Sequence, residues 1–300
     1  MYLITGAAGQ SGGVGRSVVE MLLGRGEQVR AMVRREDARA QRLRDLGAEV
    51  VIGDLTNPRN VFDAMAGIER MFFNLSVSLD YLEATAIACA AVREVGGFDV
   101  IVNMSQMTVS EMSLTSTGES LQQWLHWLSE QVMNWSQVPV VHIRPTIFVD
   151  NPLFTLLARR SVHDRGILPL PFGTGRTSPI AAVDVARVVT EILLNPAERV
   201  GHVYELTGPE VLDINGLAER YSRALDRPVS PEDTEYDEWI RQYLRVSGLP
   251  DHVQQHIATM ARLHREDRYH RRSDDFEKLI GEPPQTVEHY IAAQPELFGG

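Results

Sequence analysis

The chain has 300 residues, of which 44% are hydrophobic and 23% are charged, a composition typical of globular proteins with a large buried core. Lys and Arg total 29 against 40 Asp and Glu, which gives a formal net charge of -11. Such a charge repels phosphate backbones, so we expect no nucleic-acid partner. The single cysteine, Cys89, excludes a disulfide framework and a cysteine zinc site, and we expect no metal.

From its first residues, we expect this chain to have no secretion signal. Met1 is followed at once by YLITGAAG, without a basic segment and an apolar segment in sequence. Elsewhere no apolar run approaches the length of about 20 residues that spans a bilayer. We therefore expect a cytoplasmic protein with no membrane partner.

Short β-rich runs alternate with amphipathic helical patterns through the first half of the chain. Strict alternation predicts parallel strands joined by crossover helices, and hence a doubly wound α/β sheet of the Rossmann type. The expected strands cover 2–5, 28–33, 49–53, 70–75, 99–104 and 139–144. The expected helices cover 15–23, 36–46, 61–65, 81–95 and 121–135.

After Arg144-Pro145 the alternation loosens, and from Glu232 onward only helical patterns remain. In between, the sequence predicts helices at 153–165, 183–194 and 216–224 and short strands at 167–170 and 202–206. We expect a nucleotide-binding domain over 1–150 and a smaller, mostly helical substrate or partner lobe over 151–300. The two are expected to be intertwined, with elements near 183–206 contributed to the first.

A glycine-rich loop, TGAAGQSGGVG from Thr5 to Gly15, joins the first expected strand to the first expected helix. Glycines let a backbone turn tightly and approach a pyrophosphate, whose charge then lies at the N-terminus of the helix. Gly15 is better placed for close helix packing, which makes the loop longer than usual. The cofactor-binding candidates here are Gly6, Ala8, Gly9, Gln10 and Val14.

The second expected strand ends in Met32-Val33-Arg34-Arg35. NAD-preferring proteins carry an acid at this place, whereas a basic residue favours the 2'-phosphate of NADP. Glu36 and Asp37 come too late for that role and suit the first turn of the next helix. We therefore expect NADP (NADPH), with NAD less favoured, and Arg34 as its phosphate ligand; the alternative is a solvated helix start.

Further candidates follow the third, fourth and fifth strands. Asp54 can accept the amine of adenine while Leu55 packs on the ring, or it can cap a helix; both roles are compatible. At the carboxyl ends of the next two strands, where such sheets bind ligands, the sequence places two polar segments. These are Asn74-Leu75-Ser76 and Met104-Ser105-Gln106.

With TGAAGQSGGVG, VRR, GDLT, HIRPTIFVDNPLF and DVARVV before HVYELTGPE, the chain resembles the NmrA-like branch of the atypical short-chain dehydrogenases, from residue 1 to about 215. That branch contains NADPH-dependent quinone and carbonyl reductases, and also regulators that bind NAD(P) without turnover. The resemblance implies cofactor contacts in the loop, at Arg34 and at Asp54-Leu55. It also places Pro145, Thr146 and Phe148 near the nicotinamide.

Short-chain dehydrogenases share a Tyr-x-x-x-Lys pair on the helix after strand five, in which the lysine holds the ribose and lowers the tyrosine pKa. Counting back from Glu130 and Trp135-Ser136 puts this pair on Gln122 and His126. Both positions face the same way, but the proton donor is lost. His126 is a candidate catalytic and ribose-binding residue, or else a packed structural histidine. Ser105 is the second catalytic candidate, since its hydroxyl, like Gln106 and Thr108, can polarise a carbonyl.

Other features have less specific meanings. Met104, Met107, Met112 and Met133 can line an adaptable apolar pocket or fill a core. His252 and His256 share a helix face but lack a third ligand. The basic run from Arg262 to Arg272 fits a solvated helical face better than a nucleic-acid site.

Two functional hypotheses follow. The first is an NADPH-dependent oxidoreductase that reduces a quinone-like or carbonyl small molecule, because hydride transfer to an activated acceptor needs little help from a protein acid. The second is a non-catalytic NADP(H)-binding redox sensor with a regulatory protein partner, which the missing tyrosine and lysine favour. Epimerase or dehydratase chemistry is a weaker third choice, since it needs the same lost tyrosine.

Overall fold

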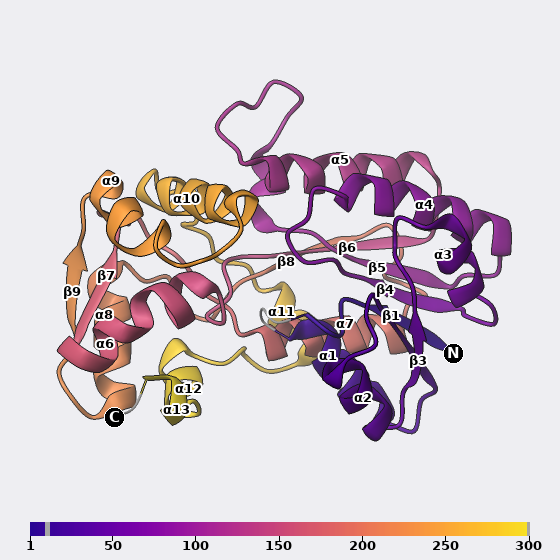
Figure 1. Cartoon of the computed structure of the whole chain (residues 1–300), viewed down its shortest axis with the longest axis horizontal. Coiled ribbons are helices and arrows are strands. Elements are labelled where there is room, and N and C mark those ends of the chain that lie inside the picture. Colours follow the sequence, from indigo (N-terminus) through magenta and orange to yellow (C-terminus); the bar gives the residue numbers. More distant parts are fainter. Residues whose placement is uncertain (10–12, 299–300) are drawn as a thin grey trace. The chain divides into compact units, whose positions relative to one another are not determined.

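The computed structural model describes residues 1–9 and 13–298. Its central feature is a seven-stranded sheet with the order β3-β2-β1-β4-β5-β6-β8 (Figure 1). The pairs from β3 to β6 are parallel, as the alternating pattern predicted. The strands are β1 (Tyr2–Thr5), β2 (Val29–Val33), β3 (Glu49–Ile52), β4 (Arg70–Phe73), β5 (Val100–Met104), β6 (Val140–Pro145) and β8 (Val203–Leu206).

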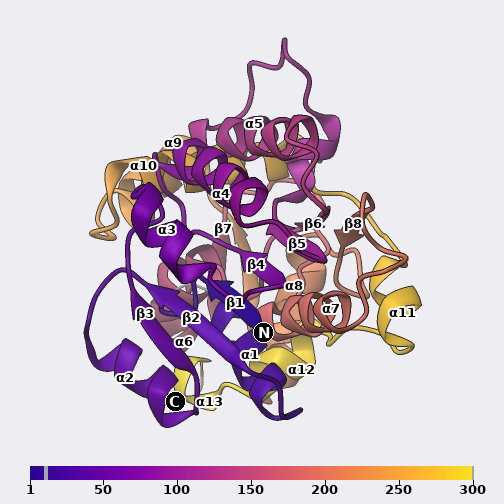
Figure 2. The same cartoon turned by 90° about the vertical axis from the view of Figure 1, so that its right-hand side faces the viewer.

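Helices cover both faces of this sheet, with α1, α2 and α7 on one face and α3, α4 and α5 on the other (Figure 2). Each helix turns an apolar stripe toward the strands; α1, for example, buries Val18, Val19 and Leu22 completely. The fold class predicted from the sequence is confirmed. The helices are α1 (Val14–Leu23), α2 (Ala38–Asp45), α3 (Pro58–Ala64), α4 (Tyr81–Val95), α5 (Leu121–Trp135) and α7 (Ala182–Leu194).

The chain forms two compact units. The first comprises Met1–Val109, Gln122–Arg144 and Val185–Tyr204, and the second Ser110–Leu121, Pro145–Asp184 and the chain from Glu205 onward. The chain therefore passes between the two units several times. Segments 110–121 and 145–150 belong to the second unit, although they lie within the range 1–150 expected for the nucleotide-binding domain. The division of roles between a nucleotide-binding and a substrate-binding part stays a prediction.

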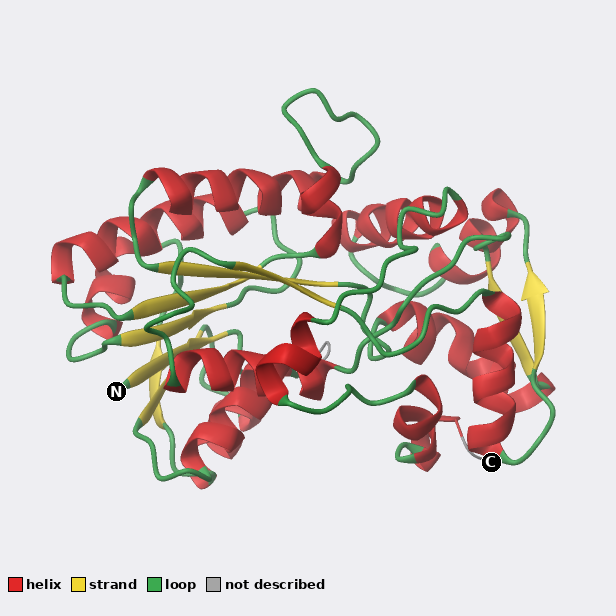
Figure 3. Ribbon diagram, turned by 180° about the vertical axis from the view of Figure 1, so that it is seen from behind, coloured by secondary structure: helices red, strands yellow, loops and turns green. Residues whose placement is uncertain are grey.

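The second unit consists mainly of helices, which lie to one side of a short parallel pair of strands (Figure 3). Its largest buried side chains include Trp239, Phe154 and Phe172. The elements are η2 (Leu153–Ala158), α6 (Arg159–Arg165), β7 (Ile167–Leu170), α8 (Ile214–Leu225), β9 (Ser230–Asp233), α9 (Tyr236–Trp239), η3 (Ile240–Leu244), α10 (Asp251–Arg265), α11 (Asp275–Ile280), α12 (Val287–Ala292) and α13 (Pro295–Phe298).

The prediction of helical structure alone from Glu232 onward is wrong at its start, because Glu232 and Asp233 belong to β9. The sequence of this strand, SPED, has no alternation of apolar and polar residues. It is a strand only because it pairs in register with β7, from Ile167 opposite Ser230 to Leu170 opposite Asp233.

Candidate functional site

The glycine-rich loop leaves β1 through a turn that only glycine fits. Gly6 has a φ of +71°, and a Cβ atom at this position would lie 2.7 Å from the carbonyl oxygen of Asn74. The backbone N–H of Gly9 closes the turn by donating to the Gly6 carbonyl at 3.1 Å. Gln10 lies outside the described residues.

The loop ends at the start of α1. Gly13 is the N-cap residue and has no side chain to occupy the N–H groups of the first turn, which suits an anion at this place. Val14 follows as the buried first residue of the helix. A Cβ atom on Gly15 would lie 2.9 Å from the backbone nitrogen of Ala7, which confirms the predicted role of Gly15 in close helix packing.

Thr5 fixes the neighbouring strand end. Its hydroxyl donates to the Asn74 carbonyl at 2.8 Å and accepts the Asn74 backbone N–H at 2.9 Å. The carboxyl ends of β1 and β4 are thereby joined, and two predicted residues, Gly6 and Asn74, become neighbours. Ser76 is exposed two residues further on.

Arg34 and Arg35 follow β2 as exposed side chains. Within 1–9 and 13–298, neither forms an ion pair. The pKa of the Asp54 carboxyl is lowered, first by hydrogen bonds from Thr56 and also by the positive charge of Arg34. Arg34 and Asp54, which follow different strands, thus lie in one electrostatic environment at the end of the sheet.

The two acids after Arg35 serve α2. The Asp37 carboxylate accepts the backbone N–H groups of Arg39 at 2.8 Å and Ala40 at 3.4 Å, and is the N-cap. Glu36 forms a bidentate ion pair with Arg44 at 2.6 and 2.7 Å. The expectation that these acids serve the helix start is confirmed for Asp37.

Arg39 was not predicted as a site residue. Its guanidinium pairs with Asp37 at 2.5 Å and donates to the carbonyl oxygen of Ala8, in the glycine-rich loop, at 3.1 Å. The sequence signal was present, because Arg39 is a further cation shortly after β2. Without the fold, nothing linked it to residue 8.

Asp54 does not cap α3. Its Oδ1 atom accepts the backbone N–H and the hydroxyl of Thr56 at 3.0 and 2.8 Å, and the cap of α3 is Asn57. The helix-cap alternative is therefore wrong, because the chain makes one more turn before the helix begins. The hydrogen bonds of Asp54 with the described residues leave its Oδ2 atom for an adenine amine. Leu55 is half-buried beside the first-unit core.

Ser105 directly follows β5 and is 3% exposed. Its backbone N–H donates to Ile143 at 2.8 Å, while its hydroxyl has no hydrogen-bond partner among the described residues. A buried hydroxyl without a partner is uncommon in folded proteins. Close by in the chain, the Thr108 hydroxyl contacts the Gln106 side chain at 3.4 Å.

Gln122 and His126 lie on one buried face of α5, in direct contact. The side-chain nitrogen of Gln122 lies 3.1 Å from His126 Nε2, and its oxygen accepts the backbone N–H of Ser78 at 3.0 Å. The His126 ring packs against Tyr81, with ring centroids 4.2 Å apart. Both proposed readings of His126, in the site and in packing, remain compatible with this geometry.

Tyr81, which the sequence did not single out, does not replace the missing acid. Its hydroxyl is buried and donates to the Met104 carbonyl at 2.6 Å. Burial raises the pKa of this phenol, and the negative charge of Glu130 raises it further. Tyr81 is therefore a poor proton donor at neutral pH.

A largely buried ion pair holds α5 against β6. Arg144 donates to both carboxylate oxygens of Glu130, at 3.0 and 2.6 Å, and the Glu130 side chain is 1% exposed. The bidentate geometry fixes the helix along its axis and in rotation. The sequence marked Glu130 only as the end of the dehydrogenase helix and missed its partner.

Pro145, Thr146 and Phe148 belong to the second unit. Thr146 donates its backbone N–H to Leu206 at 2.9 Å, and its buried hydroxyl has no hydrogen-bond partner among the described residues. Phe148 is half-buried and bridges to Ile180.

Taken separately in each unit, these residues fit a dinucleotide. Gly6 and Gly15 have no Cβ atom where one would clash with backbone, α1 begins without a side-chain cap, and the buried Ser105 hydroxyl has no hydrogen-bond partner among the described residues. The cofactor contacts themselves stay predictions.

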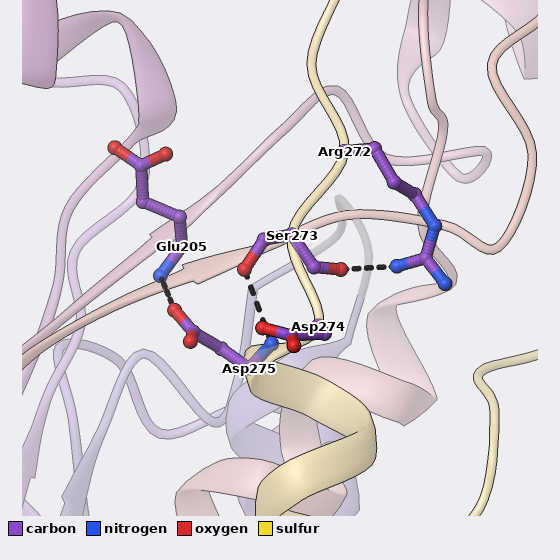
Figure 4. Close-up of a pocket in the computed structure, with 5 residues that line it drawn as sticks. All are labelled: Glu205, Arg272, Ser273, Asp274 and Asp275. Atoms are coloured by element: carbon purple, nitrogen blue, oxygen red, sulfur yellow. Dashed lines mark hydrogen bonds between the residues drawn. The ribbon is translucent and has the colours of Figure 1, made fainter.

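An open pocket of about 560 Å³ lies in the second unit, lined by Glu205 and residues 272–275 (Figure 4). The backbone N–H of Glu205 donates to Asp275 at 2.8 Å, and that of Asp275 to Ser273 at 3.1 Å. The Glu205 carboxylate points away from Asp275 and accepts a hydrogen bond from the Arg271 guanidinium at 3.2 Å. None of these residues was predicted.

The basic run does not form one solvated helical face, because α10 ends at Arg265. Arg268 and Arg271 are only 30% and 23% exposed, and both pair with Glu111. The expectation fails because sequence spacing cannot show a partner more than a hundred residues away.

Other features concern single residues. His256 is buried and bonded through Nδ1 to Ser120 at 2.8 Å, and Met133 belongs to the first-unit core. In the described part of the chain, no three His, Cys, Asp or Glu residues are grouped as metal ligands. No helix there is long and apolar enough to cross a membrane.

A family model described as NAD(P)H-binding matches residues 9–196. Along 299 residues, which is all of this chain and 99% of the relative, the sequence is 25% identical to an NAD(P)H azoreductase of Xenophilus azovorans.

Two solved structures share the fold. An NADPH-dependent quinone oxidoreductase from Escherichia coli, in complex with NADPH, superposes with a TM-score of 0.83 at 22% identity, covering 98% of this chain and 99% of that one. NmrA, a negative transcriptional regulator in complex with NADP, superposes with a TM-score of 0.79 at 18% identity, covering 99% and 95%. The NAD(P)-binding fold that the sequence resemblance implies is confirmed.

Proposed function

Because the chain belongs to the NAD(P)H-binding family, we propose that it is an NADPH-dependent oxidoreductase that reduces a quinone-like or carbonyl small molecule. The observation that supports the proposal is the contact of Gln122 with His126 at 3.1 Å, at the two positions to which the count along α5 assigns the dehydrogenase tyrosine and lysine. Such a site suits acceptors whose reduced form is a stabilised anion. A quinone meets that requirement, since its hydroquinone anion can take its proton from water.

Different residues of the chain would bind the different parts of the cofactor. The backbone of Gly6, Gly9 and the first turn of α1 would hold the pyrophosphate. Arg34 would hold the 2'-phosphate with paired donors. Asp54 and Leu55 would hold the adenine, with Asn74 and Ser76 lining the end of β4.

We assign the remaining candidates to the reacting end of the cofactor. The chemistry that bound NADPH supplies is hydride transfer. Ser105 would donate its hydroxyl hydrogen bond to the acceptor oxygen, and His126 would orient the ribose. Pro145, Thr146 and Phe148 would shield the nicotinamide from water. A cytoplasmic location stays a prediction.

The test is a steady-state measurement of NADPH oxidation with quinones, aldehydes and azo dyes, the last because of the relative that is an azoreductase. We expect turnover with quinones to exceed that with simple aldehydes. If the protein binds NADPH but turns over none of these acceptor classes, the proposed oxidoreductase function is wrong.

That outcome would favour the second candidate, a non-catalytic NADP(H)-binding regulator with a protein partner. Its specific support is the buried Tyr81, whose hydroxyl is committed to Met104 and cannot replace the missing acid. The similarity in fold to NmrA agrees with this alternative.

A further inference from the structure

Arg39 joins the glycine-rich loop to the turn that follows β2. Its Nη1 atom donates to the Ala8 carbonyl at 3.1 Å, while Nε and Nη2 donate to Asp37 Oδ2 at 3.0 and 2.5 Å. The side chain is 34% exposed. One guanidinium thus contacts two segments that are about thirty residues apart in the chain.

Asp37 fixes the direction of that guanidinium. The same carboxylate caps α2, so it is held by the backbone N–H groups of Arg39 and Ala40. The Arg39 hydrogen bonds lower the pKa of the Asp37 carboxyl to about 2. The partner of Arg39 therefore stays ionised throughout the neutral range, and it neutralises the charge of the arginine.

In the loop, the contact falls on a peptide group that is held at both ends. The peptide joining Ala8 to Gly9 donates its N–H to the Gly6 carbonyl at 3.1 Å and offers its carbonyl oxygen to Arg39. Because a trans peptide is planar, fixing both ends fixes the orientation of the whole group. The backbone from Gly6 to Gly9, which would face a pyrophosphate, is then set before any ligand arrives.

We propose that Arg39 is a positioning residue that preorganises the phosphate-binding loop through the Ala8 carbonyl. This rests on the proposed function, since it assumes that the loop receives the pyrophosphate of the cofactor. Preorganisation strengthens binding because less conformational freedom is lost when the ligand arrives. We assign the 2'-phosphate to Arg34, which forms no ion pair with the described residues, and we expect Arg39 to affect NADPH and NADH alike.

The experiment is calorimetric titration of NADPH, NADH and ADP into the wild type and Arg39→Ala. All three ligands carry the pyrophosphate, and only NADPH carries the 2'-phosphate. We expect each dissociation constant to rise about fivefold to thirtyfold, which corresponds to about 1–2 kcal/mol. The ratio of NADPH to NADH affinity should stay within about twofold of the wild type.

The matched control is Arg42→Ala, which removes the same charge from an exposed position on the same helix. We expect it to leave all three affinities unchanged. Arg39→Lys, which keeps the charge but loses the forked geometry, should give an intermediate loss. Hydrogen exchange of the Gly9 amide without ligand supplies a second readout and should be faster in Arg39→Ala.

Unchanged affinities together with unchanged Gly9 exchange in Arg39→Ala would overturn the inference while leaving the proposed function intact. A loss confined to NADPH would also overturn it, because Arg39 would then be a ligand of the 2'-phosphate. A wild type that binds none of the three ligands would overturn the proposed function, and the inference with it. If the wild type binds these ligands but shows no turnover, only the proposed oxidoreductase activity is contradicted, and the inference about Arg39 stands.

Discussion

The side-chain nitrogen of Gln122 lies 3.1 Å from Nε2 of His126, one helical turn further along α5. The Gln122 oxygen is already occupied by the Ser78 N–H, so its amide nitrogen faces the histidine as a donor. Nε2 must then accept, which leaves the ring proton on Nδ1. An imidazole thus occupies the position that the count along α5 assigns to the dehydrogenase lysine.

His126→Ala should weaken NADPH binding or turnover and also lower the free energy of unfolding by about 1–3 kcal/mol. The second effect follows from the loss of a buried ring packed on Tyr81. His126→Gln, which retains a hydrogen-bonding side chain, separates the two effects through calorimetry and urea unfolding. If both variants lose only stability, His126 is a packing residue.

Arg34→Ala should weaken NADPH binding by about 10- to 100-fold, since a charge-assisted hydrogen bond to phosphate contributes about 1.5–3 kcal/mol. NADH should change by less than about threefold, because it lacks the 2'-phosphate. The wild-type preference should shrink as salt is raised. Calorimetric titrations of both cofactors at two salt concentrations measure these affinities. Equal losses of affinity for NADPH and NADH, or a wild type that prefers NADH, would contradict the assignment.

Ser105→Ala should lower turnover about tenfold without lowering the melting temperature. The hydroxyl has no hydrogen-bond partner among the described residues, so its removal relieves a desolvation cost of about 1–3 kcal/mol. Ser129→Ala is the matched control, because this buried hydroxyl is bonded to Thr85 at 3.0 Å. It should reduce stability and leave turnover unchanged. If Ser105→Ala instead lowers stability and leaves turnover unchanged, Ser105 is not a residue of the active site.

Two buried histidines should make the protein sensitive to mild acid. Burial lowers the pKa of His264 to about 3 and that of His256 to about 4, from about 6.5 when unfolded. The unfolded state therefore binds more protons below about pH 6.5. Stability is complete above that pH and falls as the pH drops toward 4, by about 1.4 kcal/mol per pH unit for each histidine.

His264→Phe tests this dependence, since it keeps a ring between Phe172 and Tyr269 and removes one titrating group. Between about pH 4.5 and 6, the slope of the unfolding free energy against pH should then fall by about 1.4 kcal/mol per pH unit, which is the contribution of one proton. An unchanged slope in His264→Phe would refute the assignment.

The sheet could be predicted because each strand is a short apolar run and each helix a longer amphipathic one. The bounds expected for α4 and α5, 81–95 and 121–135, are those observed. The glycine-rich turn after β1 was predictable for a similar reason, since the positive φ of Gly6 and the close approach of Gly15 to Ala7 both arise within the loop.

Features that depend on distant partners could not be predicted. β9 exists only through its pairing with β7. Asp54 and Asn57 are both good cap residues, and the path of the chain selects Asn57. The partners of Arg39 and Arg268, Ala8 and Glu111, lie 31 and 157 residues away. No local pattern encodes such contacts.

The exchange of segments between the units has a consequence for synthesis in the cell. Glu111 leaves the ribosome long before its partners Arg268 and Arg271, and β8 follows its neighbour β6 only after some sixty residues. While the chain is nascent, β6 is therefore an unpaired sheet edge, the kind of surface on which chains aggregate. Segment 110–121 acquires Arg268 and Arg271 as partners only after about 150 further residues have been added, so the charge of Glu111 also stays unpaired during that part of synthesis.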